Sequence, residues 1–156
     1  MGLRWHRGLS PGERHHLAFL FPEPLSGNAA LRILIVEDAP LIRKMYRLVF
    51  SPQKHELTYA ENGRQALDEL ARSGGREDLI LLDLRMPDMD GVAFIRALRA
   101  EARFSRIPIV LTTVEPNTSD LLKQATALGV AAVVKKPWRP QELRAVVESV
   151  LKTALE

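Results

Sequence analysis

The sequence predicts an α/β fold, a doubly wound parallel sheet of five strands with five helices. Two observations predict it. From Leu31 onward, five short apolar runs alternate with segments whose apolar residues follow helical spacing. Four of the runs are nearly continuous in apolar residues, which is typical of strands covered by helices on both faces of a sheet. This alternation favours right-handed crossovers between parallel strands.

The expected strands are short, and only the second is not dominated by aliphatic residues. A strand of this kind spends its whole length inside the protein, so its apolar residues need not alternate with polar ones. We expect strands at 31–36, 57–60, 78–83, 107–113 and 130–135.

The helices between the strands follow from apolar residues three and four positions apart. In the helix before the last strand, Leu121, Ala125 and Leu128 share one face, and Gly129 is placed to end the helix. The last helix has the clearest stripe, at spacings of three, four, seven and eight residues. Its members are Leu143, Val146, Val147, Val150 and Leu151.

Residues 1–30 differ from the rest of the chain, because they are rich in Gly, Pro, His and Arg and show no sustained period. We expect an N-terminal extension followed by one domain over 31–156. The segment beginning at Ser10 fits the start of a short helix over 11–20. We favour over this helix a mostly disordered, flexible tail or a start codon placed too early.

Composition limits the class of protein. A chain of 156 residues can bury about 70% of its unfolded surface in one core. The absence of cysteine excludes disulfides and thiolate metal sites. The early apolar run at 17–21 is too short to span a membrane, so we expect a soluble, cytoplasmic chain. The net charge of +3 is spread among residues of both signs, which argues against nucleic-acid binding.

Charged and hydroxyl residues follow several expected strands at the carboxyl end. In a parallel sheet these ends meet at one edge, where ligands bind. Two like charges about 5 Å apart repel by about 3 kcal/mol at an effective dielectric of 20. The carboxylates at this edge therefore need a cation. The residues at the strand ends are Glu37, Asp38, Asp83, Thr112, Thr113, Lys135 and Lys136.

Hard oxygen ligands of this kind suit Mg²⁺, which takes octahedral coordination and is commonly shared with a phosphate. Lys136 could pair with anionic phosphoryl oxygens, and Thr113 could donate a hydrogen bond to one of them. Asp83 lies centrally among the strand ends and is the candidate nucleophile of an aspartyl-phosphate reaction. The edge is thus expected to perform phosphoryl transfer.

Each residue also has a purely structural interpretation. Asp38 lies two residues before Pro40 and could cap the next helix. Thr113 could be an ordinary strand residue, and Lys136 a solvated loop charge. Capping, however, does not require such residues at several separate strand ends.

Three further residues of the segment "LLDLRMPDMDG" are assigned to turn chemistry. Asp88 and Asp90 suit a turn, and Gly91 is expected to supply conformational freedom where the next helix begins.

Four motifs together resemble the receiver domain of bacterial two-component response regulators, a family with single-domain chemotaxis members. They are "ILIVED", "LLDLRMPDMDG", "IPIVLTT" and "VVKKPW". The resemblance covers residues 31 to about 154. It implies a flavodoxin-like sheet of order 2-1-3-4-5 and assigns roles to individual residues of the sheet edge.

By this resemblance, Glu37 and Asp38 form the metal-binding acidic pair and Asp83 is the phosphorylated aspartate. The backbone carbonyl of Arg85 is implied as a third protein ligand of Mg²⁺. Thr113, rather than its neighbour in the sequence, takes the hydroxyl position because it lies five residues after the proline of "IPIVLTT".

Lys136 takes the lysine position because it immediately precedes a proline, and the resemblance implies that the Lys136–Pro137 peptide is cis. Trp138 stands where relatives often have phenylalanine. We expect it to pack against the last helix, and the alternative is an exposed anchor for a partner.

The chain departs from the family pattern at two positions. Val133 replaces an aromatic residue, which puts an aromatic switch coupled to the threonine in doubt. Val114 replaces a smaller residue and would narrow access to the phosphoryl group. Arg85 and Glu115 flank the site and are expected to form a salt bridge across its mouth. We therefore expect slow loss of the phosphoryl group.

The resemblance implies a switch that accepts a phosphoryl group on Asp83 from a histidine kinase or phosphotransfer protein, with Mg²⁺ required. Relatives signal through their fourth helix, fifth strand and fifth helix. Because no further module follows the last expected helix, we expect output through protein contacts or onward transfer of the phosphoryl group in a phosphorelay. We expect a monomer or weak dimer that binds neither nucleic acid nor membrane.

Two other function classes remain open from the residues. One is an interaction module with this fold that signals without phosphorylation. The other is a hydrolase of the haloacid dehalogenase type, which needs two aspartates after its first strand. Here that strand is followed by Glu-Asp-Ala, and the triplet that starts at Asp83 lacks a second aspartate.

The histidines carry weaker signals. His6, His15 and His16 could bind a metal but are better explained as solvated tail residues, and His55 as a loop residue.

Overall fold

Five parallel strands form one sheet in the order β2-β1-β3-β4-β5, as predicted. The computed structural model describes residues 30–51 and 55–154. The strands lie within a residue or two of their expected positions. Their bounds are Arg32–Val36 (β1), Glu56–Ala60 (β2), Leu79–Asp83 (β3), Ile109–Thr113 (β4) and Ala132–Lys135 (β5).

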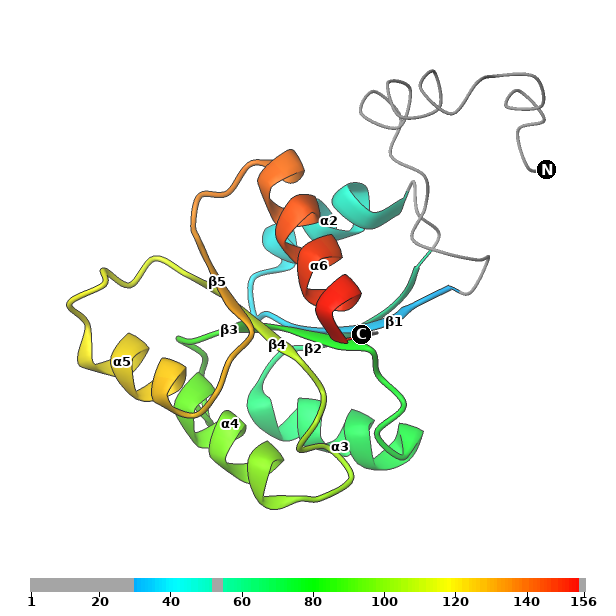
Figure 1. Ribbon diagram of the computed structural model, residues 1–156, viewed down its shortest axis with the longest axis vertical. Coiled ribbons are helices and arrows are strands. Elements are labelled where there is room, and N and C mark those ends of the chain that lie inside the picture. Colours follow the sequence, from blue (N-terminus) through cyan, green and yellow to red (C-terminus); the bar gives the residue numbers. More distant parts are fainter. Residues whose placement is uncertain (1–29, 52–54, 155–156) are drawn as a thin grey trace.

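Within the described residues, five helices connect and follow these strands, also as predicted. Helices α2 and α6 cover one face of the sheet, and α3, α4 and α5 cover the other (Figure 1). The helices are α2 (Pro40–Phe50), α3 (Gly63–Ser73), α4 (Gly91–Ala100), α5 (Asp120–Ala127) and α6 (Pro140–Ala154).

The fourth strand begins two residues later than expected because of a proline. Pro108 has no backbone N–H to donate to a neighbouring strand, although its carbonyl accepts a hydrogen bond from the Ile80 amide at 3.0 Å. Regular pairing therefore starts at Ile109, while Ile107 is buried before the strand as part of the core.

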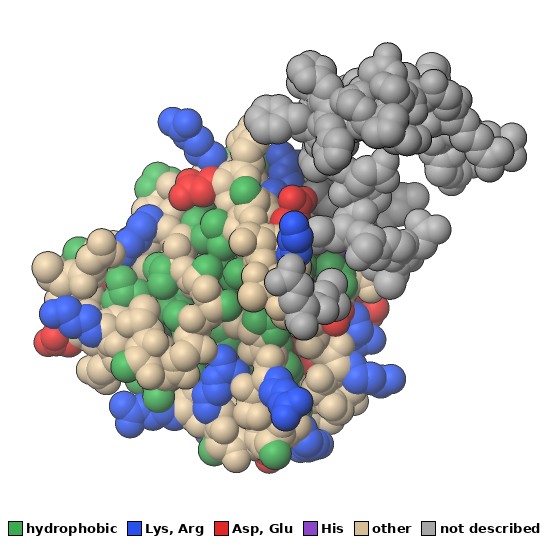
Figure 2. Space-filling view, viewed as in Figure 1, with side chains coloured by type: hydrophobic (Ala, Val, Ile, Leu, Met, Phe, Trp, Pro, Cys, Tyr) green, Lys and Arg blue, Asp and Glu red, His purple; other side chains and the backbone are tan. Residues whose placement is uncertain are grey.

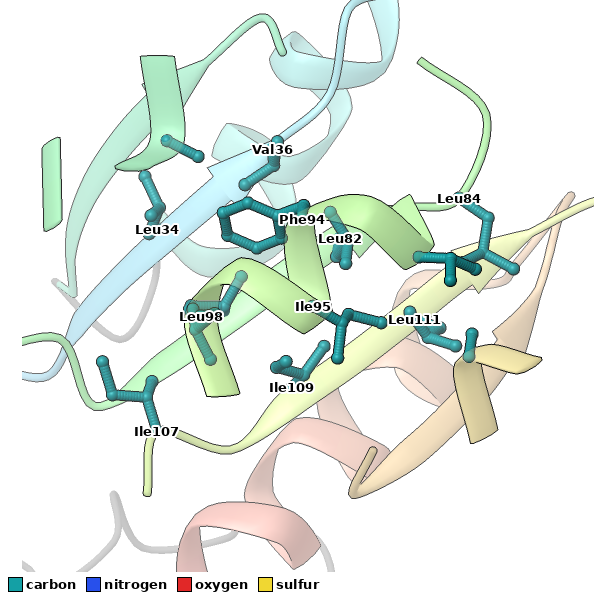
Figure 3. Packing of buried hydrophobic residues seen from close by; sticks show 14 of the residues in the cluster. Leu34, Val36, Leu82, Leu84, Phe94, Ile95, Leu98, Ile107, Ile109 and Leu111 are labelled. Carbon is teal, nitrogen blue, oxygen red and sulfur yellow. The ribbon is translucent and has the colours of Figure 1, made fainter. Parts of the chain in front are cut away.

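The helices α3, α4 and α5 cover an aliphatic core that we call the three-helix core. Its centre is Phe94 of α4, which is fully buried and lies beside Val36 and Leu82 of the sheet (Figure 3). Leu98 and Ile95, on the same side of α4, extend this packing along the sheet.

The opposite face is the two-helix core, formed by α2, α6 and the strand residues between them. It contains three aromatic side chains, Tyr46, Phe50 and Trp138, together with Leu143, Val147 and Leu151 of the predicted stripe on α6. Trp138 is only 7% exposed and belongs to the same buried cluster as three residues of α6, so it is not an exposed surface anchor.

The turn that leads into α4 contains the predicted turn residues Asp88 and Asp90. Asp88 has a φ of 68°, a left-handed conformation that aspartate tolerates. Asp90 caps α4 by accepting a hydrogen bond from the Ala93 amide at 2.8 Å.

The expected reason for Gly91 is wrong. Its φ is not among the positive values of the described residues, so no conformational freedom is needed. Its role is steric, because a Cβ atom there would lie 2.8 Å from Leu84 Cα.

At the opposite end of α4, Arg99 joins three segments of chain. Its guanidinium donates hydrogen bonds to the carbonyls of Ser105 and Ile107, before β4, at 2.8 and 3.1 Å. It also donates to the Gly129 carbonyl, after α5, at 2.9 Å. Gly129 has a φ of 86°, in keeping with its predicted place at the end of that helix.

The stripe expected on α5 faces the three-helix core. Ala125 is fully buried in that core, and Leu121 and Leu128 are partly buried and pack against it. Leu122, which the stripe did not include, is 5% exposed and also belongs to the core, so the buried face of α5 is wider than the periodicity suggests.

Residues 1–29 lie outside the described part of the chain, and with them the helix expected over 11–20 and the histidines His6, His15 and His16. No helix within the described ranges is long and apolar enough to cross a membrane. Figure 2 shows Lys and Arg side chains interspersed with acidic and uncharged groups on the viewed face, as the sequence indicated.

Candidate functional site

The carboxyl ends of β1, β3, β4 and β5 bring the predicted residues to one edge of the sheet. Asp83 is the last residue of β3 and pairs in register with Thr112 of β4, so Thr113 lies one residue further along. Lys135 ends β5 opposite Thr113. Glu37 directly follows β1, where its amide donates to the Ala60 carbonyl at 3.0 Å.

Three carboxylates converge at this edge into what we call the acid cluster. Glu37, Asp38 and Asp83 each offer an oxygen, and these oxygens all lie within 4.8 Å of one another. Glu37 is buried, Asp83 is half-buried and Asp38 is exposed. The cluster thus opens to solvent on one side while its far side is closed by protein.

Lys136 supplies a positive charge to the acid cluster. Its Nζ atom donates a hydrogen bond to Glu37 Oε2 at 2.8 Å and lies 3.5 Å from Asp83 Oδ2. The Lys136 side chain is 16% exposed, so the ammonium is largely withdrawn from water. It is therefore not the solvated loop charge considered as the alternative.

The electrostatic environment disfavours ionisation of the buried carboxyl groups. Burial raises the pKa of Glu37 and of Asp83 above their ordinary values, and the Lys136 ammonium opposes the rise in each case. Three carboxylates face one ammonium within the cluster, which leaves an excess negative charge that an added cation would relieve.

The interpretation of Asp38 as a helix cap is wrong. The N-cap of α2 is Ala39, and no side chain caps that helix. The acidic turn is instead held by Glu37 Oε1, which accepts a hydrogen bond from the Ala39 amide at 3.2 Å. Asp38 is thereby left exposed at the mouth of the cluster.

Arg43 is a supporting residue that the sequence reasoning missed. It lies in the second turn of α2, and its guanidinium donates to the carbonyls of Glu37 and Asp38 at 3.0 and 3.4 Å. A basic residue one turn into a helix that follows an acidic pair is the signal that could have identified it.

The two neighbouring threonines of β4 face opposite sides of the sheet. Thr113 Oγ1 accepts a hydrogen bond from the Glu115 amide at 3.0 Å, at the site edge. Thr112 Oγ1 accepts one from the Tyr46 hydroxyl in the two-helix core, at 2.8 Å. Thr113, which the sequence predicted as the site hydroxyl, is thus the threonine whose side chain contacts the loop after β4 at the candidate site.

The expected ion pair between Arg85 and Glu115 is present across the mouth of the site. The Arg85 guanidinium lowers the pKa of Glu115, whose backbone carbonyl accepts a hydrogen bond from Lys135. The Arg85 amide donates to Asp83 Oδ1 at 3.3 Å. Val114 is 69% exposed, and its expected effect on access stays a prediction.

The segment after β5 is shaped as the resemblance implied, since the Lys136–Pro137 peptide is cis. The Lys136 amide donates to the Thr113 carbonyl at 2.8 Å, which ties this segment to β4.

The donor set fits a magnesium ion. Mg²⁺ is bound by oxygens about 2.0–2.1 Å away, so oxygens on opposite sides of the ion are about 4.2 Å apart. The spread of up to 4.8 Å among the oxygens of Glu37, Asp38 and Asp83 is close to this, and each ligand is a hard carboxylate.

Comparison with known proteins agrees with this geometry. The sequence model of the response regulator receiver domain matches residues 33–148, most of the chain. The chain belongs to this family. Its five-stranded sheet, order and helices are those of a receiver domain of two-component signalling.

Several curated relatives share the receiver domain. Chemotaxis protein CheY1 of Helicobacter pylori is 31% identical over 124 residues, which cover 79% of this chain and 98% of CheY1. The cyclic di-GMP phosphodiesterase response regulator RpfG of Xanthomonas campestris is 40% identical over 125 residues, which are 80% of this chain but only 32% of RpfG. The chain likewise spans 50% of the DNA-binding response regulator MtrA of Mycolicibacterium smegmatis.

Solved structures show the same receiver fold. The receiver domain of the sensor histidine kinase PA1611 from Pseudomonas aeruginosa aligns with a TM-score of 0.72 at 27% identity, over 80% of this chain and 99% of that one, and was crystallised with magnesium in its active-site cleft. Vibrio cholerae CheY4 aligns with a TM-score of 0.71 at 29% identity, over 78% and 99%.

Proposed function

We propose that the receiver domain, over residues 31–156, accepts a phosphoryl group on Asp83 from a histidine kinase or phosphotransfer protein in an Mg²⁺-dependent reaction. The observation that supports this proposal is the convergence of Asp83 with Glu37, Asp38 and Lys136 at one edge of the sheet. These residues come from three separate strand ends, and helix capping does not account for their meeting.

In the proposed reaction a carboxylate oxygen of Asp83 attacks the phosphorus of a phosphohistidine. The P–N bond breaks, the imidazole leaves, and an acyl phosphate forms on Asp83. Glu37, Asp38, Asp83 and the Arg85 carbonyl would hold Mg²⁺. The ion would neutralise negative charge on the phosphoryl oxygens. The Arg85 amide, which donates to Asp83 Oδ1, orients the attacking carboxylate.

Lys136 and Thr113 are proposed to stabilise the transferred group. Lys136 already lies 3.5 Å from Asp83, so its ammonium can pair with a phosphoryl oxygen after little movement. Thr113 Oγ1 acts as an acceptor toward the Glu115 amide, which leaves the hydroxyl hydrogen free to be donated to the same group.

Phosphorylation is proposed to shift a conformational equilibrium that a partner protein detects. The output surface would comprise the fourth helix, fifth strand and fifth helix of the domain, which are α5, β5 and α6. Output would take place in the cytoplasm, through protein contacts or onward transfer of the phosphoryl group in a phosphorelay. The protein would act as a monomer or weak dimer and would not contact nucleic acid or membrane.

Incubation with acetyl phosphate and MgCl₂, followed by intact-mass measurement, tests the proposal. The protein is expected to gain the mass of one phosphoryl group, and Asp83→Asn is expected to abolish the gain. Asp88→Asn is the matched control, because Asp88 lies in the same turn but outside the acid cluster. EDTA in place of MgCl₂ should also prevent the gain.

A mass gain that survives Asp83→Asn, or no gain in the parent protein, would refute the proposal. Either result would favour the remaining alternative, an interaction module that keeps the fold and signals without phosphorylation.

A further inference from the structure

The two-helix core contains a polar contact directly behind the site. The Tyr46 hydroxyl of α2 donates a hydrogen bond of 2.8 Å to Thr112 Oγ1 of β4, across 66 residues of sequence. Tyr46 is 1% exposed and Thr112 is fully buried. Burial raises the pKa of Tyr46, so its hydroxyl stays protonated and remains the donor.

A second contact connects Tyr46 to the site lysine. The Trp138 ring stacks on the Tyr46 ring with 5.2 Å between centroids and an interplanar angle of 27°. Trp138 lies two residues after Lys136, whose amide donates to the Thr113 carbonyl at 2.8 Å. Thr113 in turn follows Thr112. The contacts therefore form a closed circuit that runs from Tyr46 to Thr112, through Thr113 and Lys136, to Trp138 and back to Tyr46.

We expect a displacement of one residue in this circuit to displace the others, because the side chains of Tyr46, Thr112 and Trp138 are buried. Protein interiors are close-packed, and small shifts at one point are passed on rather than absorbed. The two rings have few rotatable bonds, and the hydrogen bond fixes the Tyr46 ring relative to β4. A displacement of the backbone at Lys136 or Thr113 is therefore expected to change the contact between Trp138 and Tyr46.

We propose that Tyr46, Thr112 and Trp138 are positioning residues that hold Lys136 and Thr113 in place and couple the acid cluster to helix α2. We call these three residues the aromatic relay. The inference deepens the proposed function and rests on it for its catalytic part. It adds a route from the site to α2, on the opposite face of the sheet from the side chain of Val133.

Cation binding is expected to engage this relay. Lys136 donates to Glu37 Oε2, and Glu37 is one of the three carboxylates that would hold Mg²⁺. Competition between the cation and the ammonium for this carboxylate would weaken the contact between Lys136 and Glu37. Trp138, two residues on, would then change its stacking against Tyr46.

The chain offers a matched control for Tyr46. It has two tyrosines, and the other, Tyr59 of β2, also has a buried hydroxyl. The Tyr59 hydroxyl has no hydrogen-bond partner among the described residues and is not part of the relay. Tyr46→Phe and Tyr59→Phe thus remove the same atom, but only the first breaks the relay.

The first experiment measures the rate of phosphorylation by acetyl phosphate as a function of donor concentration. Tyr46→Phe and Thr112→Val should each lower the maximal rate constant by about three- to tenfold while leaving the half-saturating concentration unchanged. The double variant should be no slower than the slower single variant, because both changes remove one hydrogen bond. Tyr59→Phe should match the parent.

The second experiment needs no phosphorylation. In a Trp5→Phe background Trp138 is the sole tryptophan, so its emission reports the relay alone. Addition of MgCl₂ should change this emission saturably, and Tyr46→Phe and Thr112→Val should each reduce the change at least by half. Tyr59→Phe should retain the full change. Calorimetry of MgCl₂ binding is run on the same samples.

The relay is overturned if calorimetry shows that MgCl₂ binds but the Trp138 emission does not change. It is also overturned if the emission of Tyr46→Phe and of Thr112→Val changes with MgCl₂ as much as that of Tyr59→Phe. Equal slowing by Tyr59→Phe and Tyr46→Phe would also overturn it, because it would indicate a general loss of packing. Failure of the proposed function is distinguishable, since it shows as an absent phosphoryl mass gain while the emission response to MgCl₂ persists.

Discussion

The two faces of the sheet are built differently. The three-helix core is aliphatic apart from Phe94 and Phe104, and it packs against α3, α4 and α5. The two-helix core contains Tyr46, Phe50 and Trp138 and includes the buried hydrogen bond to Thr112. The site lies at the edge where the two faces meet.

This difference suggests a division of labour between the faces. An aliphatic core stabilises through burial alone and tolerates little loss of volume. A buried hydrogen bond contributes only about 1 kcal/mol but imposes a fixed geometry on its partners. We therefore expect the three-helix core to supply most of the stability, and the two-helix core to fix the position of groups behind the site.

The largest expected effect breaks the three-helix core at its centre. Phe94 is fully buried beside β1 and β3, so Phe94→Ala should lower the free energy of unfolding by about 3–5 kcal/mol. Urea denaturation followed by circular dichroism measures the change. Phe94→Leu, which fills more of the space, should cost clearly less, and equal losses for the two variants would argue against a tightly packed centre.

A smaller effect is expected where α4 begins. A Cβ atom on Gly91 would lie 2.8 Å from the backbone Cα of Leu84, which cannot move aside, so Gly91→Ala should cost about 1–3 kcal/mol. Gly63 is the matched control, because it is likewise the first residue of a helix. The three atoms nearest to its new Cβ would all belong to the side chain of Met89, with the sulfur at 2.9 Å, and this side chain is flexible.

The same urea titrations compare the two glycine variants. Gly63→Ala should be near neutral, since alanine favours helix more than glycine does. A loss for Gly63→Ala as large as that for Gly91→Ala would show that backbone contact is not the deciding factor.

The smallest expected effect concerns pH at the rim of the two-helix core. His55 lies with its ring centroid 6.4 Å from that of Phe50, and burial lowers its pKa below the ordinary value of 6.5, with Asp78 opposing the shift. The unfolded chain then binds the proton more readily than the folded protein. The stability that His55 contributes is therefore complete above pH 6.5 and is lost as the pH falls through the folded pKa.

Comparison with His55→Gln isolates this contribution, because other titrating groups are common to both proteins. Between about pH 7.5 and about pH 5.5 the parent should lose more unfolding free energy than the variant does. Parallel pH profiles of the two proteins would show that His55 is not protected from protonation by the fold.

The sequence predicted those features that depend on local patterns. Apolar runs, four of them nearly continuous, identified all five strands, and the rule that parallel strands end at one edge predicted that Glu37, Asp38, Asp83 and Lys136 would meet. Both inferences need only the order of elements along the chain. The resemblance to a known family added the cis peptide before Pro137.

Features that depend on the placement of a helix were not predicted. The contact between Tyr46 and Thr112 requires a particular rotation of α2 against β4, which helical periodicity does not specify. Arg43 was missed for a different reason, because its contact is local: its side chain reaches back over one turn to the acidic pair, and the spacing of a basic residue after that pair was not considered. Gly91 was explained by the wrong cause, because its neighbour Leu84 is close only in the folded chain.

The guanidinium of Arg99 links the end of α4, the approach to β4 and the exit from α5 through three backbone carbonyls. Segments held by one side chain lose their attachments together when that side chain is released. Hydrogen exchange in these three regions should consequently follow a single opening event, so that this end of the domain behaves as one cooperative unit, separate in its fluctuations from the acidic edge at the other end of the strands.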